Sequence, residues 1–245
     1  MNMVREFRKL KRLKIPYILL GMSLLMGLMI GANFSGSSGK GQYAMLLQSV
    51  NFVLALLVPI TAAVVSNLSI DMEHRGHGWI FNVTSGVSTV RLLWSKFLVD
   101  SIVICCFVIF NYLSALFLGR LLGVTSSFNL IFWLSNIVCI CLVSTTFIGF
   151  HILCASRWEN QLISMAIGVL GGLLGIYGFL LPDVLARFIP WGYFAVSSHV
   201  IFTEQGNTFD AVYLYPPYLW IFGYFVASIA LFYWGSYLTS QEKAK

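Results

Sequence analysis

The amino-acid sequence predicts an all-α protein that crosses a membrane six times, and three observations support this fold class. Of the 245 residues 58% are hydrophobic and only 10% are charged, with a mean hydropathy of +0.84, unlike a soluble domain. Apolar runs of roughly 20 residues, enough to span a bilayer, occupy residues 15–32, 45–65, 97–118, 130–153, 162–181 and 213–238. These runs lack the alternation of barrel strands, so only helices would satisfy their backbone hydrogen bonds.

The distribution of basic residues predicts the orientation of these spans. With the N-terminus inside, twelve Lys and Arg residues fall in inner segments and three, Lys40, Arg120 and Arg187, in outer ones. Because basic loops stay in the cytoplasm, we expect both termini to be cytoplasmic. The first run is too long for the core of a signal peptide and is expected to be retained. The net charge of +6 suits anionic inner-leaflet lipid as a partner, and nucleic-acid binding is not expected.

The N-terminal segment, residues 1–14, has the pattern of an interfacial helix. Val4, Phe7, Leu10 and Leu13 recur at helical spacing, and six basic residues surround them. An apolar stripe opposite basic residues is typical of a helix that lies in the headgroup region. The segment leads directly into the first span, so we interpret residues 1–245 as a single transmembrane domain.

Polar residues interrupt the second run. Gln48, Asn51 and Asn67 lie in or beside it, and Pro59 lies within it. Lipid penalises such residues unless they face protein or a water-filled path. These three polar residues are the candidate substrate path. The alternative is that they only hold helices together.

Residues 71–96 form the most informative inner segment. The first part is polar and the second is amphipathic, with Ser88 placed to cap a short helix that lies against the membrane or a partner. Lys96 and Asp100 are four residues apart, a spacing that allows an ion pair across one helical turn.

Two other segments have unusual composition. The fifth run carries glycines that would leave one helical face nearly bare, which favours close helix packing and, as an alternative, a sliding surface. Residues 182–212 form a long outer loop, yet residues 189–196 are apolar, so we expect a half-buried helix or a re-entrant hairpin there. The glycines are Gly168, Gly171, Gly172, Gly175 and Gly178.

The sequence shows no motif for catalysis or for a cofactor. The phosphate-binding motif Gly-x-x-x-x-Gly-Lys-Ser/Thr does not occur. His74 and His77 lack zinc-site spacing, and the five cysteines lie in apolar runs or directly after one, where packing is expected. His151 is the one histidine within a run, and no nucleophile elbow accompanies it. Asp100 is the one carboxylate in the runs, fewer than an ion-coupled carrier usually has.

This layout resembles the permease subunits of ABC-2 type transporters, and among them the small permeases of lantibiotic-immunity transporters. The similarity covers a basic N-terminal helix, six spans, Glu73 and Gly78 after the second span, a following segment that ends in Arg91 and Lys96, and an apolar outer loop. The resemblance implies an ABC-2 (type V exporter-like) permease fold in the bacterial cytoplasmic membrane.

The resemblance also implies that residues 71–96 are a coupling segment that docks on a separate ATP-binding subunit. The contact residues would be Glu73, His74, Arg75, Gly78 and Arg91. ATP and Mg²⁺ would be bound by that partner, with no cofactor in this chain. The implied assembly has two ATPase subunits and a second permease chain, identical or similar.

The implied function is export of a lantibiotic or similar antimicrobial peptide, which would give immunity. One alternative is a permease of the same type that moves lipid, a drug or another hydrophobic cargo. Others are a non-transporting scaffold or sensor subunit, an intramembrane enzyme, and a self-sufficient channel or carrier. Association with an ATPase would favour the permease readings.

Overall fold

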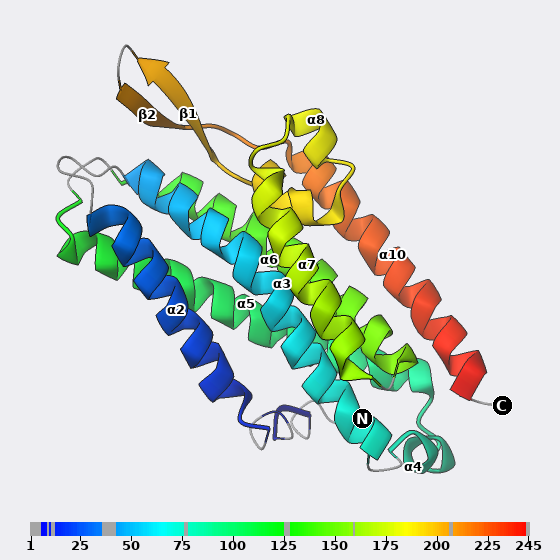
Figure 1. Cartoon of the computed structure of the whole chain (residues 1–245). Helices are drawn as coiled ribbons and strands as arrows, with labels where there is room; N and C mark the ends of the chain where they lie inside the picture. The colour runs from blue at the N-terminus through cyan, green and yellow to red at the C-terminus, as the bar shows by residue number, and fades with distance from the viewer. Residues whose placement is uncertain are drawn as a thin grey trace.

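The computed structural model describes residues 6–8, 10, 13–35, 43–75, 78–124, 128–158, 160–205 and 208–243. Within these residues, six helices are long and apolar enough to cross a membrane. They lie side by side in one bundle (Figure 1). The predicted all-α fold with six spans is confirmed. The six helices are α2 (Ile15–Ser35), α3 (Tyr43–Arg75), α5 (Thr89–Leu121), α6 (Leu130–Arg157), α7 (Gln161–Gly178) and α10 (Tyr218–Lys243).

Of the helices that extend beyond the predicted spans, α3 and α5 extend furthest, both at the same end of the bundle. α3 continues past Val65 to Arg75, and α5 begins at Thr89. A helix does begin after Ser88, but the prediction that it is short is wrong, because those residues form the first turns of α5. The predicted cap itself is confirmed, since the Ser88 hydroxyl accepts a hydrogen bond from the backbone N–H of Arg91 (3.4 Å).

The last span starts later than predicted. α10 begins at Tyr218, directly after Pro216 and Pro217, whereas Tyr213 ends a β-strand. Proline lacks a backbone donor and is favoured at the start of a helix, so the proline pair marks this boundary.

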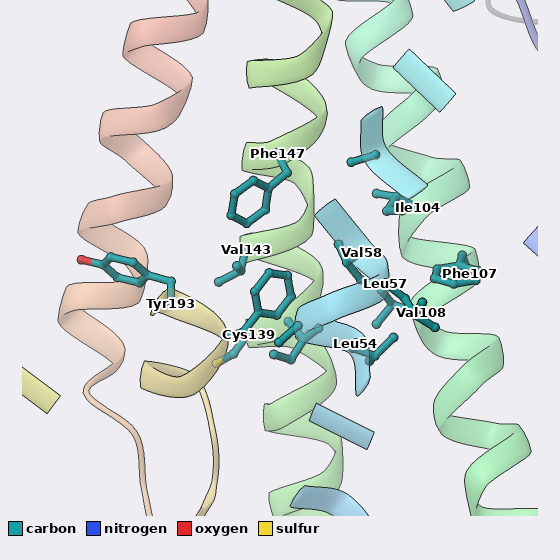
Figure 2. Packing of buried hydrophobic residues seen from close by; sticks show 14 of the residues in the cluster. Leu54, Leu57, Val58, Ile104, Phe107, Val108, Cys139, Val143, Phe147 and Tyr193 are labelled. Atoms are coloured by element: carbon teal, nitrogen blue, oxygen red, sulfur yellow. The ribbon is translucent and has the colours of Figure 1, made fainter. Parts of the chain in front are cut away.

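α3 is the central helix of the bundle (Figure 1). Of the residues in its most apolar stretch, 78% are buried within the protein, against 17% in α2 and in α10. α2, α5, α6 and α7 all pack against it. Figure 2 shows apolar side chains of α3, α5 and α6 meeting in the core, among them Leu57, Phe107 and Val143. A helix that is apolar on all sides must be covered by lipid or by other helices, and α3 is covered by other helices.

The glycine face of α7 packs directly on the backbone of α3. A Cβ at Gly172 would lie 2.5 Å from the carbonyl oxygen of Leu56, and a Cβ at Gly175 would lie 2.6 Å from that of Ala55. Real Cβ atoms do not approach this closely, so glycine is required at both positions. Close packing, the first of the two predicted roles, accounts for these glycines.

The two ends of the bundle differ in structure (Figure 1). We call one the α4 end, because it carries α4 (Gly78–Thr84) with the start of α2 and the end of α10. The other is the hairpin end, where the two strands pair antiparallel, with Val200 opposite Tyr213. The hairpin end comprises α8 (Asp183–Ala186), the 3₁₀ helix η1 (Pro190–Gly192), α9 (Tyr193–Val196), β1 (Val200–Gln205) and β2 (Thr208–Tyr213).

The apolar stretch at residues 189–196 returns into the bundle at the hairpin end. It forms η1 and α9, in which Phe194 is fully buried and stacks on Phe147 of α6 at 5.6 Å between ring centroids. Gly178 at the end of α7 lies against Gly192, where a Cβ would be 3.0 Å from the Gly192 Cα. The two-stranded hairpin that follows was not predicted.

The N-terminal segment lies against the bundle at the α4 end. Residues 6–8 and 10 are helical, and Leu10 packs with Val65 and Val99. Phe7 is 39% exposed. Val4 and most of the basic residues of the predicted interfacial helix lie outside the described residues, so its interfacial position stays a prediction.

Candidate functional site

The α4 end brings together four of the five residues predicted for the coupling segment. Glu73 lies in the last turn of α3 and is buried, with 3% exposure. Gly78 is the first residue of α4, and a Cβ placed on it would overlap the Oε2 atom of Glu73. A larger residue here would force the Glu73 carboxylate to move, and Glu73 lies directly beneath the start of α4.

His74 joins α3 to α4 and α6. Its Nε2 lies 3.0 Å from the carbonyl oxygen of Ala155, and the indole Nε1–H of Trp79 points to its Nδ1 at 3.4 Å. A carbonyl only accepts, so the ring proton is on Nε2 and Nδ1 accepts from Trp79. The two rings also meet edge to face at 5.7 Å. These contacts fix the position of α4 relative to two spanning helices.

Arg75 and Arg91 are the exposed members of the predicted set. Arg75 pairs with Asp71 one turn earlier on α3, with 2.7 Å between Nε and Oδ2. Arg91 lies in the first turn of α5, and within the described residues it makes no hydrogen bond or ion pair to the other four. A polar groove of about 430 Å³ opens beside Arg75, lined by Asp71, His74, Arg75, Asn160 and Gln161.

A buried charge network lies beneath this surface. Lys96 of α5 has 0% exposure, and its Nζ lies 3.0 Å from Glu73 Oε1, 3.3 Å from Glu6 Oε2 and 2.7 Å from the Ser69 carbonyl oxygen. The predicted pair between Lys96 and Asp100 is wrong. The ammonium points to the N-terminal segment and α3, where three oxygens compete successfully with a single carboxylate on its own helix.

Sequence reasoning missed Glu6, Ser69 and Lys96 as members of this network. A signal for Glu6 was available, because it is the one acidic residue among the first 70 and follows the basic Arg5 in a strongly basic segment. Such a residue is a candidate partner for a cation. Nothing in the sequence identified that cation as Lys96.

The three predicted path residues lie at different levels of α3. Asn51 is fully buried and exchanges hydrogen bonds with Asn136 of α6 (3.0 and 2.9 Å) and accepts one from the Tyr112 hydroxyl of α5. Gln48 accepts a hydrogen bond from Ser198 near the hairpin. Asn67 is directed at the Gln161 carbonyl oxygen at 3.5 Å. All three contact other elements of the chain, and their role in a path stays a prediction.

A neutral polar cluster lies at the hairpin end around His199. The buried ring donates from Nδ1 to the Ser197 carbonyl oxygen (2.9 Å), and its Nε2 lies 2.8 Å from the Ser135 hydroxyl and 3.2 Å from the Tyr218 hydroxyl. Burial lowers the pKa of His199 from 6.5 to about 4. The imidazole is therefore neutral near pH 7 and joins α6, α10 and the start of β1.

His151 and Ser164 form a second buried contact between a histidine and a serine, the residue types of a catalytic base and nucleophile. His151 Nδ1 lies 3.0 Å from the Ser164 hydroxyl, and both side chains are buried between α6 and α7. A nucleophile must be reached by substrate and its base must be oriented by a third group. Among the described residues His151 Nε2 has no hydrogen-bond partner, so no third group orients the ring as a base. The pair instead links α6 to α7.

A family model described as ABC-2 family transporter protein matches residues 3–175, well over half of the chain. The chain belongs to the ABC-2 transporter family. The match covers α2 to α6 and most of α7. It therefore includes the predicted coupling residues and the Lys96 network at the α4 end. No curated protein and no solved structure matches the chain. As a member of the ABC-2 family, the chain is a membrane permease subunit, a class that normally works with an ATPase partner and is generally not itself catalytic.

Proposed function

We propose that this ABC-2 permease subunit docks an ATP-binding partner through α4 and the adjoining end of α3. For this docking, α4 and both termini must lie in the cytoplasm. The excess of basic residues in those segments favours this orientation. ATP and Mg²⁺ are bound by the partner, and the assembly holds two ATPase subunits and a second permease chain, identical or similar.

The observation that carries the proposal is the firm attachment of α4 to the bundle. His74 contacts both Trp79 of α4 and the Ala155 carbonyl of α6, and α4 starts directly on Glu73. A displacement of α4 is therefore passed to α3, the most buried of the spanning helices. Exposed Arg75 and the polar groove beside it supply charged and hydrogen-bonding contacts for a protein partner.

We propose a lantibiotic or similar cationic antimicrobial peptide as the exported cargo. Residues 182–212 carry three acidic residues and one basic residue, a net charge of −2 in a chain of net charge +6. Such a segment attracts a cationic amphipathic molecule through its charge. A neutral lipid or drug gains nothing from these carboxylates. The charged residues are Asp183, Glu204 and Asp210, with Arg187.

Affinity purification of the tagged chain from its native membrane, with mass spectrometry of the retained proteins, tests the partner. We expect an ABC ATPase and a six-helix permease. Arg75→Glu should reduce the recovered ATPase on the order of tenfold, because it reverses an exposed charge in the docking surface. Arg120→Glu makes the same change on an exposed residue at the other end of α5 and should have no effect.

Recovery of the chain alone, where other ABC complexes of the same membrane remain intact, would instead favour a self-contained channel or carrier. An ATPase that is recovered but dispensable for function would point to a scaffold or sensor subunit. For the cargo, cells that make the complete complex should tolerate more cationic lantibiotic than cells without it. Equal protection against uncharged hydrophobic drugs would favour the broader cargo class.

A further inference from the structure

Lys96 carries a full charge at a position with no exposure to solvent. A buried ammonium is costly unless oxygens replace the water that it has lost. Three oxygens do so here, from Ser69, Glu73 and Glu6, at 2.7, 3.0 and 3.3 Å from Nζ. An ammonium has three N–H donors, so each of them has one oxygen.

These three oxygens tie separate segments to one atom. Glu6 belongs to the N-terminal segment, Ser69 and Glu73 belong to the end of α3, and Lys96 belongs to α5. Glu73 also lies against Gly78, the first residue of α4. The Nζ of Lys96 is therefore the point at which the N-terminal segment, α3 and α5 meet beneath α4.

A buried carboxyl group, that of Asp100, lies one turn further along α5. Asp100 has 0% exposure and makes no close hydrogen bond with a described residue, and the Ser69 side chain and the Lys96 amine lie near enough to interact with it. Residues four apart on a helix are neighbours on its surface, and lysine has a flexible four-carbon stem. Asp100 is thus a second acceptor within reach of the Lys96 ammonium.

We propose that Lys96 is a positioning residue that clamps the N-terminal segment to the coupling segment, with Asp100 as its second acceptor when Glu73 moves with α4. The proposal rests on the proposed function for the cause of that movement, because α4 is the element that an ATPase partner would displace. No covalent bond changes. The ammonium exchanges one carboxylate for another, and Glu6 stays bound to it in both positions.

A double-mutant cycle at Glu73 and Asp100 tests the second acceptor in the purified chain. Thermal unfolding in detergent is measured for the wild type, Glu73→Gln, Asp100→Asn and the double variant. Alone, Asp100→Asn should leave the apparent Tm unchanged or raise it, because it removes a buried carboxylate without a hydrogen-bond partner. In the Glu73→Gln background, Lys96 depends on Asp100, so the same substitution should lower the Tm.

The expected result is this change of sign, with a coupling on the order of tenfold in the unfolding equilibrium constant. The same effect of Asp100→Asn in both backgrounds overturns the second-acceptor role. Asp183→Asn is the matched control, since Asp183 is a largely exposed carboxylate at the hairpin end. Asp183→Asn should change the apparent Tm by the same amount in the wild type and in Glu73→Gln.

Limited trypsin digestion tests the clamp. Removing the Glu6 carboxylate should free the N-terminal segment, so Glu6→Ala should speed cleavage among the basic residues of 8–14 several-fold. Lys96→Arg, which keeps a cation, should retain part of the protection. Asp71→Asn alters a carboxylate of α3 that pairs with the exposed Arg75 and not with Lys96, and it should leave the rate unchanged. Wild-type cleavage of Glu6→Ala in a folded protein would overturn the clamp.

Both measurements use the permease chain alone, so their outcomes do not depend on whether an ATPase docks on α4. A sign change in a chain that recovers no ATPase upholds the Lys96 network and refutes the docking proposal. ATPase recovery together with additive Tm effects upholds docking and overturns the second-acceptor role.

Discussion

The two ends of the bundle bury polar groups in different ways. At the α4 end, the ammonium of Lys96 is held by the carboxylates of Glu6 and Glu73 with almost no exposure to solvent. At the hairpin end, His199 is neutral and is held by a carbonyl and two hydroxyls. A buried ion that loses one partner leaves an uncompensated charge, whereas a neutral cluster loses one hydrogen bond at a time.

This difference assigns distinct mechanical properties to the two ends. The α4 end should rearrange in an all-or-none manner, because its charges must move together from one set of partners to another. The hairpin end and the Asn51 cluster in the core should instead be able to lose or exchange their hydrogen bonds one at a time. A coupling region needs the first behaviour, since two discrete arrangements are what transmit a signal between distant sites.

The largest expected effect is that of Lys96→Met. Methionine is similar in length and has no charge, so Glu6 and Glu73 would be left buried without a cation. We expect a loss of about 3–5 kcal/mol of unfolding free energy, measured by denaturant titration in detergent. Lys14→Met makes the same change at an exposed position and should cost far less. Adding Glu6→Gln and Glu73→Gln to Lys96→Met should recover most of the loss, and no recovery would show that packing is responsible.

Tyr112→Phe should have a smaller effect at the neutral core cluster. The Tyr112 hydroxyl donates to Asn51 and accepts from Asn136 Nδ2 at 2.7 Å, and the two asparagines still bond each other without it. We expect a loss of about 1 kcal/mol, measured in the same titration. Tyr177→Phe, on a residue that is 60% exposed, is the control and should be neutral. A loss as large as that of Lys96→Met would contradict the contrast between charged and neutral networks.

Hydropathy predicted the number of spans because a membrane helix depends on the sum over about 20 residues, which one or two polar positions do not change. It missed the ends of α3 and α5 for the same reason. The residues from Asp71 to Arg75 are polar, so they lie outside any apolar window, yet they continue the helix. Hydropathy reports solvent preference, and helix length beyond the membrane follows from packing of α3 against α4 and α6.

The candidate site was partly predictable. Glu73 and Gly78 were identified through the family resemblance, and the structure adds the steric reason for the glycine. The partner of Lys96 was predicted wrongly, because spacing along one helix shows only which residues are within reach. Of the two actual carboxylate partners of Lys96, Glu73 lies on another helix and Glu6 is 90 residues away in the sequence, and a single sequence contains no information on such pairings. The Ser135–His199 contact, 64 residues apart, was unpredictable for the same reason.

The smallest expected effect is the response of the hairpin end to pH. His199 has a pKa of about 4 in the folded chain, below its ordinary 6.5, because burial disfavours the charged ring. Between these two values the unfolded state binds more protons, so stability falls as the pH is lowered through 6.5 and levels off below about 4. Hydrogen exchange of the β1–β2 hairpin, corrected for its intrinsic pH dependence, should therefore show faster opening at about pH 5 than at about pH 7.

His199→Gln separates this histidine from other titrating groups. Glutamine can still donate to the Ser197 carbonyl and accept from Ser135 or Tyr218, but it does not titrate. The variant should lose the difference in hairpin opening between about pH 7 and about pH 5. If the difference persists, another group controls the hairpin, and neutrality of His199 no longer distinguishes this end from the α4 end.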